Sequence, residues 1–310
     1  MNILLTGVSG YVGSRLVPRL LADGHTVRGF SRRRDGPAPA PFVRLGIDVV
    51  TGDAVSGAGL DQAFDGVEAA YFLIHSMEPS PNGPFAARER AAAENFAAAA
   101  RAAGTGRIIY LGGPIPEGGP ASAHLTSRLG VERILMAASP CSVAFRASIV
   151  IGAQSRPFRL LVRLVERMPV LAVPAWRTHR TNPIDERDMV ELLARAATSD
   201  AVCGQTFEIG GPETVSYGEL IDRIRDHLLV SRPTISLRRI TATPIASRLA
   251  ALIAGEQHAL IGPLMESLDD DLVLDDSRAA DLLGVRLHSL DAAIEHALRE
   301  WEAVERLVAR

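Results

Sequence analysis

Short apolar runs alternate with longer segments of helical spacing through the first half of the chain. The apolar runs that we interpret as strands lie at residues 3–5, 26–30, 47–51, 68–74, 107–111 and 142–151. The segments that we interpret as helices lie between them, at residues 14–22, 60–64, 85–103 and 122–138. Strands that alternate with helices favour right-handed crossovers and a parallel sheet covered on both faces. The pattern therefore predicts an α/β protein with a doubly wound parallel sheet.

Beyond residue 151 this alternation becomes less regular. The expected elements there are a helix at 158–165, a proline-punctuated apolar segment at 170–176, a helix at 186–198, a strand at 205–209, a helix at 216–229, a strand at 231–242 and a helix-rich tail. We expect residues 1–151 to form the sheet domain, with residues 183–228 returning to it. Residues 152–182 and 229–310 are expected to form a smaller, discontinuous C-terminal lobe that binds the substrate.

Three glycines follow the first apolar run and precede the first helix. Gly7, Gly10 and Gly13 have the spacing Gly-x-x-Gly-x-x-Gly, a variant of the dinucleotide fingerprint of Rossmann sheets. The first allows a sharp turn, the second lets the backbone approach a pyrophosphate, and the third lets the helix lie close to the sheet. Expected cofactor contacts in this turn are Gly7, Ser9, Gly10, Tyr11, Val12 and Gly13. The alternative is a glycine-rich turn that binds no ligand.

The residues after the second strand bear on the choice of cofactor. An NAD site normally has an Asp or Glu about 20 residues beyond the last glycine, on the ribose 2′-hydroxyl. This chain has Ser31 followed by Arg32, Arg33 and Arg34 there, and no carboxylate before Asp35. Guanidinium groups suit a 2′-phosphate. We therefore expect NADP(H) to be preferred over NAD(H), the alternative being that the arginines form a solvated loop edge.

Composition narrows the possible classes of protein. The chain has 310 residues, 47% of them hydrophobic, and a net charge of −3, so no strong field would attract nucleic acid or an anionic membrane. It contains no lysine, which excludes Schiff-base chemistry and a lysine general acid. No apolar run is long enough for a membrane span and the first strand starts the chain, so we expect a cytoplasmic protein without a signal peptide.

The cysteines and histidines do not have the spacing of a zinc site, so no metal is expected. Cys141 and Cys203 lie far apart in the sequence. We expect them to be small core residues and not to form a disulfide.

Further segments resemble the atypical short-chain dehydrogenase/reductase superfamily, in its extended and NmrA-like branches. The matching segments are residues 6–13, 52–53, 73–77, 110–113, 145–152 and 181–184 with Asp188. The resemblance implies an NAD(P)-binding fold whose cofactor lies at the carboxyl ends of the strands. The contacts expected there, outside the glycine turn, are Ser31, Arg32, Arg33, Asp53, Ala54, Leu73, Ile74, His75, Gly112, Arg128, Ala147, Ser148 and Ile149.

One departure from the family pattern falls on the helix after the fifth strand. Working enzymes of the superfamily usually carry Tyr-x-x-x-Lys there, with the tyrosine as general acid/base and the lysine on the nicotinamide ribose. This chain has His124 and Arg128 at that spacing, and Gly112 or Gly113 replaces the serine usual after the strand. These substitutions weaken the case for the family's ordinary alcohol and ketone chemistry.

His124, Arg128 and His75 are the candidate catalytic residues. His124 and Arg128 would share one helix face, where a neutral His124 could polarise a carbonyl and Arg128 could hold ribose hydroxyls or a substrate carboxylate. His75 would lie near the nicotinamide, at the end of the fourth strand. In the alternative interpretation His124 only packs at the helix start, and His75 makes only main-chain contacts. Asp53 and Ala54 could meet the adenine amino group, or Asp53 could cap a helix.

Three functions remain open from the sequence. The first is an NADPH-dependent reductase of a small organic carbonyl or enone, with an unusual proton donor. The second is an NmrA-like sensor that binds NADP(H) without turnover and signals to a partner protein. The third is an isomerase, lyase or cyclase that retains the nucleotide. The helices at 85–103 and 122–138 could also pair across a two-fold axis in a homodimer.

Overall fold

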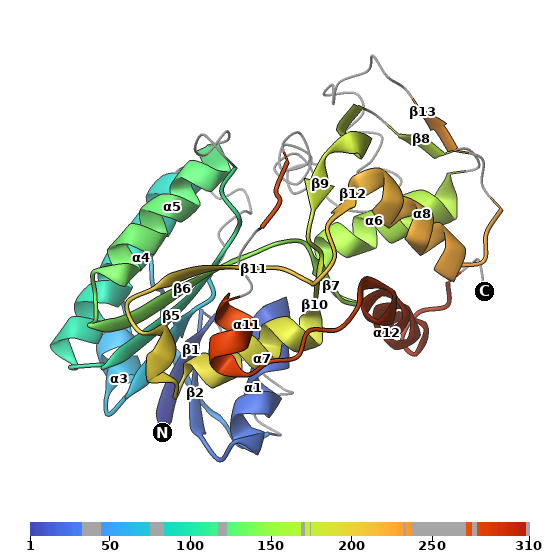
Figure 1. Cartoon of the computed structure of the whole chain (residues 1–310). Helices are drawn as coiled ribbons and strands as arrows, with labels where there is room; N and C mark the ends of the chain where they lie inside the picture. Colours follow the sequence, from blue (N-terminus) through green and yellow to red (C-terminus); the bar gives the residue numbers. More distant parts are fainter. Residues whose placement is uncertain are drawn as a thin grey trace.

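Seven parallel strands form the central sheet of the computed structural model, in the order β3-β2-β1-β4-β5-β6-β11 (Figure 1). The structure describes residues 1–32, 45–74, 84–116, 123–168, 171–173, 175–231, 234–236, 271–274 and 278–307. The sheet strands are β1 (Asn2–Thr6), β2 (Thr26–Ser31), β3 (Asp48–Thr51), β4 (Ala69–Phe72), β5 (Arg107–Gly112), β6 (Cys141–Ala147) and β11 (Thr206–Ile209). The strand order reverses between β1 and β4, which is where doubly wound sheets bind ligands. The predicted fold class is confirmed.

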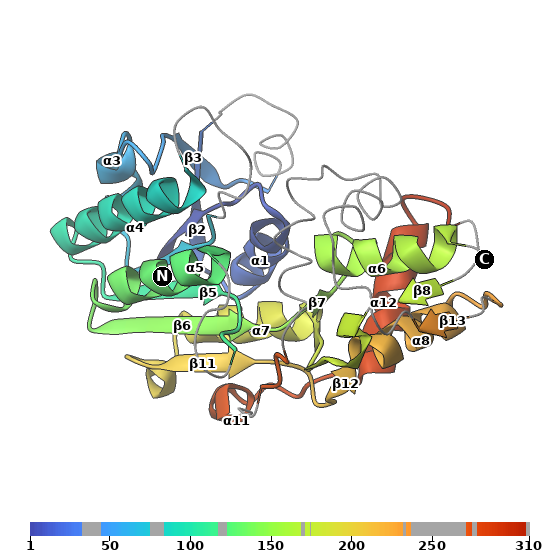
Figure 2. The ribbon, with the colours of Figure 1, turned by 90° about the horizontal axis from the view of Figure 1, so that it is seen from above.

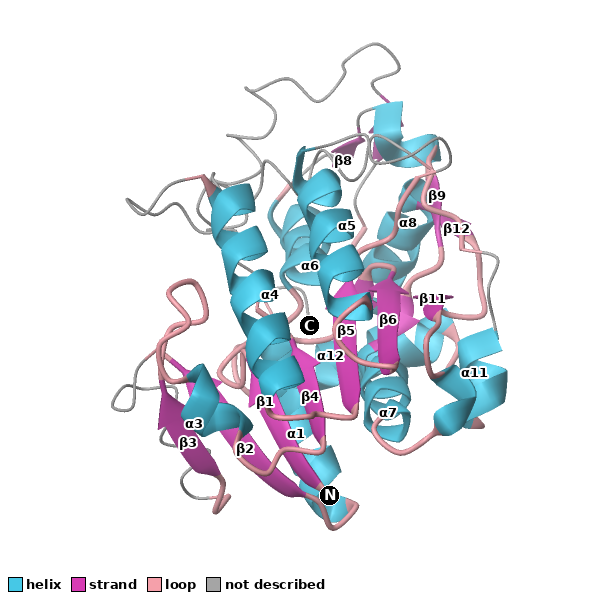
Figure 3. Cartoon of the chain, turned by 90° about the vertical axis from the view of Figure 1, so that its left-hand side faces the viewer, coloured by secondary structure: helices cyan, strands magenta, loops and turns pink. Residues whose placement is uncertain are grey.

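Helices cover both faces of this sheet (Figures 1 and 3). One face carries α1 (Tyr11–Ala22), α7 (Glu186–Ala196) and α11 (Arg278–Leu283), and the other carries α3 (Leu60–Phe64), α4 (Phe85–Ala102) and α5 (Ala123–Met136). Among the described residues, no helix combines the length and the apolar composition needed to cross a membrane.

The buried strands show why the sequence contains continuous apolar runs there. In β1, Ile3 and Leu5 belong to the core beneath α1 and α7, whereas Leu4 belongs to the core beneath α3 and α4. Successive side chains of a strand point to opposite faces, so a sheet covered on both faces needs apolar residues at every position. A run without polar alternation is therefore the expected pattern of a central parallel strand.

Figure 2 shows a smaller C-terminal lobe beside the sheet domain. The lobe has its own apolar core. Its helices are α6 (Arg156–Arg167), α8 (Tyr217–His227) and α12 (Leu290–Glu302). Its short strands form three pairs: β7 (Val150–Ile151) with β10 (Ile184–Asp185), β9 (Arg180–Thr181) with β12 (Val215–Ser216), and β8 (Leu171–Val173) with β13 (Thr234–Ser236). The 3-10 turns η1 (Ala175–Thr178) and η2 (Asp200–Val202) complete the described elements.

Two helices differ from the predicted division of the chain. α8, which was expected to return to the sheet domain, packs its buried face into the lobe core with α6 and α12. α11, which was expected in the lobe, packs against α7 and β11 in the sheet domain. Amphipathic spacing identifies the face that a helix buries, but it carries no information about the partner that covers the face.

The strand expected at residues 142–151 is interrupted in the structure. β6 ends at Ala147, and the amide of Ser148 donates to the carbonyl oxygen of Ile209 at 3.0 Å. Two residues later the chain forms β7, which pairs with β10 instead of β11. The apolar run continues through this change of partner because both segments are largely buried.

The expectation for the two cysteines is wrong. Cys141 and Cys203 are half-buried and form a disulfide, with their Cα atoms 4.4 Å apart. The parallel register of β6 and β11 pairs Ala144 with Thr206, which places Cys141 and Cys203, each three positions earlier, side by side. The sequence separation of 62 residues concealed this proximity.

Candidate functional site

The turn between β1 and α1 lies at the carboxyl end of the sheet, beside the end of β4. Gly7 has a φ of +74°, and a Cβ atom on it would lie 2.7 Å from the carbonyl oxygen of Leu73. The hydroxyl of Thr6 donates to the carbonyl oxygen of Tyr71 at 2.8 Å and so fastens the turn to β4. A residue with a side chain would be strained at Gly7 and would also collide with β4.

Gly10 and Gly13 shape the start of α1. Gly10 is the N-cap, and its amide donates to the carbonyl oxygen of Gly7 at 2.9 Å. Among the described residues, no side chain caps this helix, and its first turn carries no acidic group. A Cβ atom on Gly13 would lie 2.4 Å from the Gly7 oxygen, so the helix presses directly on the turn.

This geometry fits the phosphates of a dinucleotide. Ser9 and Gly10 are exposed, and the first amides of α1 lack a side-chain acceptor within the described part of the chain. Free amides and a positive helix end favour an anion at this position. The individual cofactor contacts of Ser9, Tyr11 and Val12 stay predictions.

The side chain of Tyr11 binds a residue that the sequence analysis missed. Its hydroxyl donates to Glu186 Oε2 at 2.5 Å, across 175 positions of sequence. Glu186 begins α7, two residues after the matched segment 181–184, and is only 4% exposed. A carboxylate at the start of a helix normally indicates only a favourable charge near the helix end, so no local pattern indicates that Glu186 also binds Tyr11.

The ends of β2 and β3 carry the residues expected near the adenosine. Ser31 ends β2, and Arg32 is exposed directly after it. Arg33 lies outside the described residues. Asp53 does not cap a helix: its Oδ1 accepts from the amide of Val55 at 2.9 Å and stabilises a turn. The carbonyl oxygen of Ala54 accepts from the Asn95 side chain at 3.0 Å, so α4 fixes this turn in place.

The ends of β4, β5 and β6 bring further expected contacts to the same edge. Leu73 and Ile74 follow β4, with the Leu73 backbone against the glycine turn, and Gly112 ends β5. Ala147 ends β6, and Ile149 follows it after Ser148. The Ser148 hydroxyl is buried at 2.9 Å from the Thr181 hydroxyl, so it already has a protein partner. His75 lies outside the described residues.

The helix after β5 places Arg128 against α4. Arg128 is 5% exposed, and its guanidinium lies 3.4 Å from Oε1 of Glu89, itself 2% exposed. The hydroxyl of Ser127 donates to the other oxygen of Glu89 at 2.8 Å. The Tyr110 hydroxyl donates to the Arg128 carbonyl oxygen at 3.3 Å, and burial raises the pKa of Tyr110 to about 12. Glu89 thus balances the charge of Arg128, a pairing that the sequence analysis did not anticipate.

His124 is placed only by its backbone, in the first turn of α5. Its side chain lies outside the described part of the structure. The predicted roles of His124 and Arg128 in the reaction therefore stay predictions.

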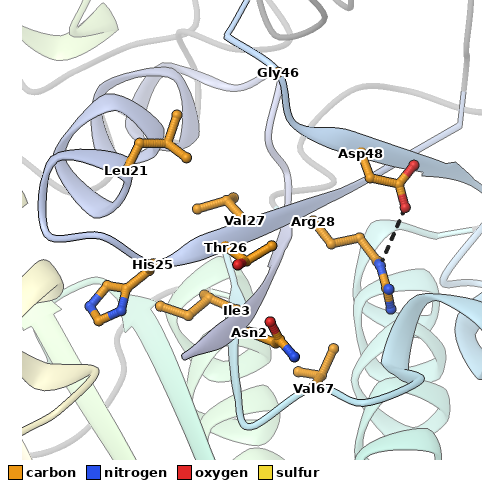
Figure 4. A pocket seen from close by; sticks show the side chains of 10 residues that line it. All are labelled: Asn2, Ile3, Leu21, His25, Thr26, Val27, Arg28, Gly46, Asp48 and Val67. Carbon is orange, nitrogen blue, oxygen red and sulfur yellow. Dashed lines mark ion pairs between the residues drawn. The ribbon is translucent and has the colours of Figure 1, made fainter.

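A cavity of about 390 Å³ lies at the opposite edge of the sheet, at the amino ends of β1 and β2 (Figure 4). Its lining includes Asn2, His25 and Arg28, and Arg28 pairs with Asp48 at 3.5 Å across its rim. The Arg28 guanidinium also donates to carbonyl oxygens at the end of α3. These groups serve to hold β2, β3 and α3 together, and the cavity is remote from the glycine turn.

Comparison with known proteins adds to this geometry. Residues 7–138 match the model of the NAD(P)H-binding family. The chain is 30% identical over 192 residues to a ceramide reductase of Caulobacter vibrioides, a match that covers 62% of this chain and 59% of the relative. It is 26% identical over 254 residues to a 2-alkyl-3-oxoalkanoate reductase of Stenotrophomonas maltophilia, covering 72% and 74% of the two chains. The chain therefore spans only about three fifths of the length of the ceramide reductase.

A solved structure shares the whole fold. UDP-glucuronic acid 4-epimerase of Bacillus cereus, in complex with UDP-glucuronic acid and NAD, has a TM-score of 0.71 and 18% identity, over 98% of this chain and 100% of that one. At this identity the likeness shows the fold alone. The family match and the glycine turn supply the cofactor class. Residues 7–138 are therefore similar to the NAD(P)H-binding family, and the whole chain shares its fold with the epimerase.

Proposed function

We propose that this protein is an NADP(H)-dependent reductase of a small organic carbonyl or enone. The observation that carries the proposal is the glycine turn, in which Gly7 and Gly13 leave the start of α1 open to a phosphate. Reduced nicotinamide supplies a hydride when it is bound at such a site. The relatives whose names describe reductases support the same reaction type.

The choice of NADP(H) rests on the end of β2. Arg32 is exposed at this end, and the sequence offers no carboxylate there before Asp35. A guanidinium binds a phosphate with two parallel hydrogen bonds and has no comparable interaction with a ribose hydroxyl. Arg32, with Arg33, is therefore proposed to bind the 2′-phosphate.

The chemistry is proposed to depend on α5. His124 would donate a hydrogen bond to the substrate carbonyl, which favours hydride arrival at the adjacent carbon. Arg128 would contact the ribose or the substrate through the small part of its side chain that is exposed. Glu89 would fix the orientation of that guanidinium through the buried ion pair.

Replacing His124 tests the reductase proposal. Purified protein is expected to oxidise NADPH above the enzyme-free rate with a member of a carbonyl and enone panel, measured by absorbance. His124→Ala should lower turnover by about 10²- to 10⁴-fold, the usual contribution of a positioned acid or base. His25→Ala, at the opposite edge of the sheet, should keep the wild-type rate. Equal rates for all three proteins would contradict the role of His124.

Replacing Arg32 tests the cofactor preference. Wild-type protein should bind NADPH more tightly than NADH, and Arg32→Ala should lower that ratio by about 10- to 150-fold, because a hydrogen bond to a charged group contributes about 1.5–3 kcal/mol. Binding is measured by titration calorimetry with each cofactor. Arg90→Ala removes an exposed arginine of α4 and should leave the ratio unchanged. A ratio near one in the wild type would contradict the preference.

A second function is favoured by one specific observation. Arg128 is buried against Glu89, and a guanidinium held in this way can stabilise α4 and α5 without meeting a substrate. In that case the protein would bind NADP(H) as a sensor and pass its redox state to a partner protein. Two results together would favour the sensor. The protein would bind the cofactor without turning over any member of the panel, and it would capture a partner protein to different extents with NADP⁺ and with NADPH.

A further inference from the structure

A polar cluster joins the first turn of α1 to α7 and to α12 of the lobe. Tyr11 donates to Glu186 Oε2 at 2.5 Å, and the Arg15 guanidinium lies 3.4 Å from Glu186 Oε1. Arg15 also pairs with Glu300 of α12. His296 of α12 belongs to the same cluster, with a ring nitrogen within 4.8 Å of carboxylate oxygens of Glu186 and Glu300. Two side chains of the glycine-turn helix therefore bind elements outside the sheet.

The chain makes room for this cluster at Gly152, which follows β7. A Cβ atom on Gly152 would lie 2.1 Å from the Tyr11 hydroxyl and 2.3 Å from Glu186 Oε2. Glu186 is 4% exposed, so its carboxyl group is surrounded by protein. The contact between Tyr11 and Glu186 therefore requires glycine at this position.

The environment of Glu186 brings its ionisation near neutral pH. Burial raises the pKa of the Glu186 carboxyl to about 7. The hydrogen bond from Tyr11 and the charge of Arg15 favour the ionised form, but they only partly offset burial, and the nearby Glu300 carboxylate opposes ionisation further. Glu186 therefore changes its charge in the range where the protein would be assayed.

Tyr11 and His296, which also face Glu186, hold their protonation states in this range. Burial raises the pKa of Tyr11 far above neutrality, so the phenol remains a donor. Burial, with the charge of Arg187, lowers the pKa of His296, which keeps the imidazole neutral. Arg187 forms its ion pair with Asp185, and Arg15 is held by Glu300.

We propose that Glu186 is a positioning residue for the cofactor, holding Tyr11 and Arg15 at the start of α1 and taking up a proton from solvent when the phosphates bind. The inference rests on the proposed binding of NADP(H). Phosphates beside the first turn of α1 add negative charge near the buried carboxylate and disfavour its ionised form. A protonated Glu186 can hydrogen-bond to the Glu300 carboxylate.

The sign of the pH dependence follows from this coupling. The cofactor-bound protein holds the Glu186 proton more tightly than the free protein, so the affinity is higher at pH values where that proton is present. Affinity falls as pH rises through the pKa of free Glu186, near 7, and levels off above the higher pKa of the complex. The 2′-phosphate has a second pKa near 6 and pairs with arginines as a dianion, so it does not take up protons in this range.

Titration calorimetry on the whole wild-type protein measures the coupling directly. NADPH is titrated at pH 7.5 in two buffers of different ionisation enthalpy, and the heat difference gives the protons taken up. We expect net uptake of a fraction of a proton. The Kd should rise about threefold to tenfold between pH 7.0 and 8.5, which is the effect of the Glu186 charge on a phosphate charge at moderate distance in the screened protein interior. If the wild-type protein binds NADPH without taking up protons, the inference is wrong.

Variants assign the proton to Glu186. Glu186→Gln should bind NADPH without proton uptake and without the pH dependence. Glu191→Gln is the matched control: it is the same change on the same helix, at a carboxyl whose pKa is lowered by its hydrogen bonds from Arg19 and Arg195. It should behave as wild type. If Glu186→Gln retains the wild-type uptake, the inference is wrong.

A second variant serves if Glu186→Gln does not fold. Tyr11→Phe removes the donor that favours the Glu186 carboxylate, so more of the free protein is already protonated and the uptake at pH 7.5 should fall. Unchanged uptake would overturn the inference. Failure of the proposed NADP(H) binding gives a different result, since the wild-type protein would then bind no NADPH at any pH.

Discussion

Gly13→Ala is expected to weaken NADPH binding by about 5- to 150-fold. The new Cβ atom would lie 2.4 Å from the Gly7 carbonyl oxygen and 2.9 Å from the Val8 Cα atom. Both are backbone atoms of the turn, so the start of α1 must move away from it. Overpacking of this kind costs about 1–3 kcal/mol. The displaced turn is the part of the chain that would hold the pyrophosphate, so this cost is expected to lower the binding free energy of NADPH. Titration calorimetry with NADPH measures the change in Kd.

Gly130→Ala provides the matched control in a second helix. Gly130 lies within α5, and a Cβ atom there would meet nothing within 4 Å. Alanine is favoured over glycine inside a helix, so this variant should gain about 0.5–1 kcal/mol of stability and keep the wild-type Kd. If both variants bind NADPH equally, the close approach of α1 to the turn is not what the site depends on.

The sequence carried enough information to predict the sheet and the glycine turn because both depend on local patterns. The helix predicted at residues 60–64 is α3, with the same bounds, and the run predicted at 107–111 is β5 with one added residue. The positive φ of Gly7 and the tight packing of Gly13 follow from a motif of seven residues. Local spacing therefore sufficed for the part of the site that binds through backbone amides.

Contacts between distant side chains could not be predicted in this way. Glu89 and Arg128 belong to helices predicted separately, and neither sequence pattern indicates that both charges are buried in one pair. Tyr11 meets Glu186 only because α7, which follows six of the seven sheet strands in the chain, returns beside α1. In both cases the fold supplies a partner for a buried carboxyl group, and hydrophobic periodicity does not indicate which residue that partner is.

The short strands show the same limit in the backbone. β7, β9, β10 and β12 are two residues each, too short for any alternation of apolar and polar positions to be recognised. Their pairing depends on where the chain is already held, as when Ile184 donates its amide to the carbonyl oxygen of Ile149. Such strands are a result of the packing between sheet and lobe, and only the folded chain reveals them.

Reduction of the Cys141–Cys203 disulfide is expected to lower the free energy of unfolding by about 4 kcal/mol. The bond closes a loop of 62 residues, and the chain-entropy model predicts a loss of this size when such a constraint on the unfolded state is removed. The loop contains α6, α7 and part of the lobe, so much of the chain gains freedom. Urea unfolding with and without reductant measures the difference.

The double variant Cys141→Ser/Cys203→Ser separates this effect from other actions of the reductant. Its stability should equal that of the reduced wild type and should not respond to reductant. Cofactor affinity should be unchanged in both, because the disulfide lies at the amino end of β6, at the opposite edge of the sheet from the glycine turn. Equal unfolding energies for oxidised and reduced wild type would mean that the register of β6 and β11, held by the amide of Gly204 on the Ser142 carbonyl oxygen at 2.8 Å, is sufficient without the covalent link.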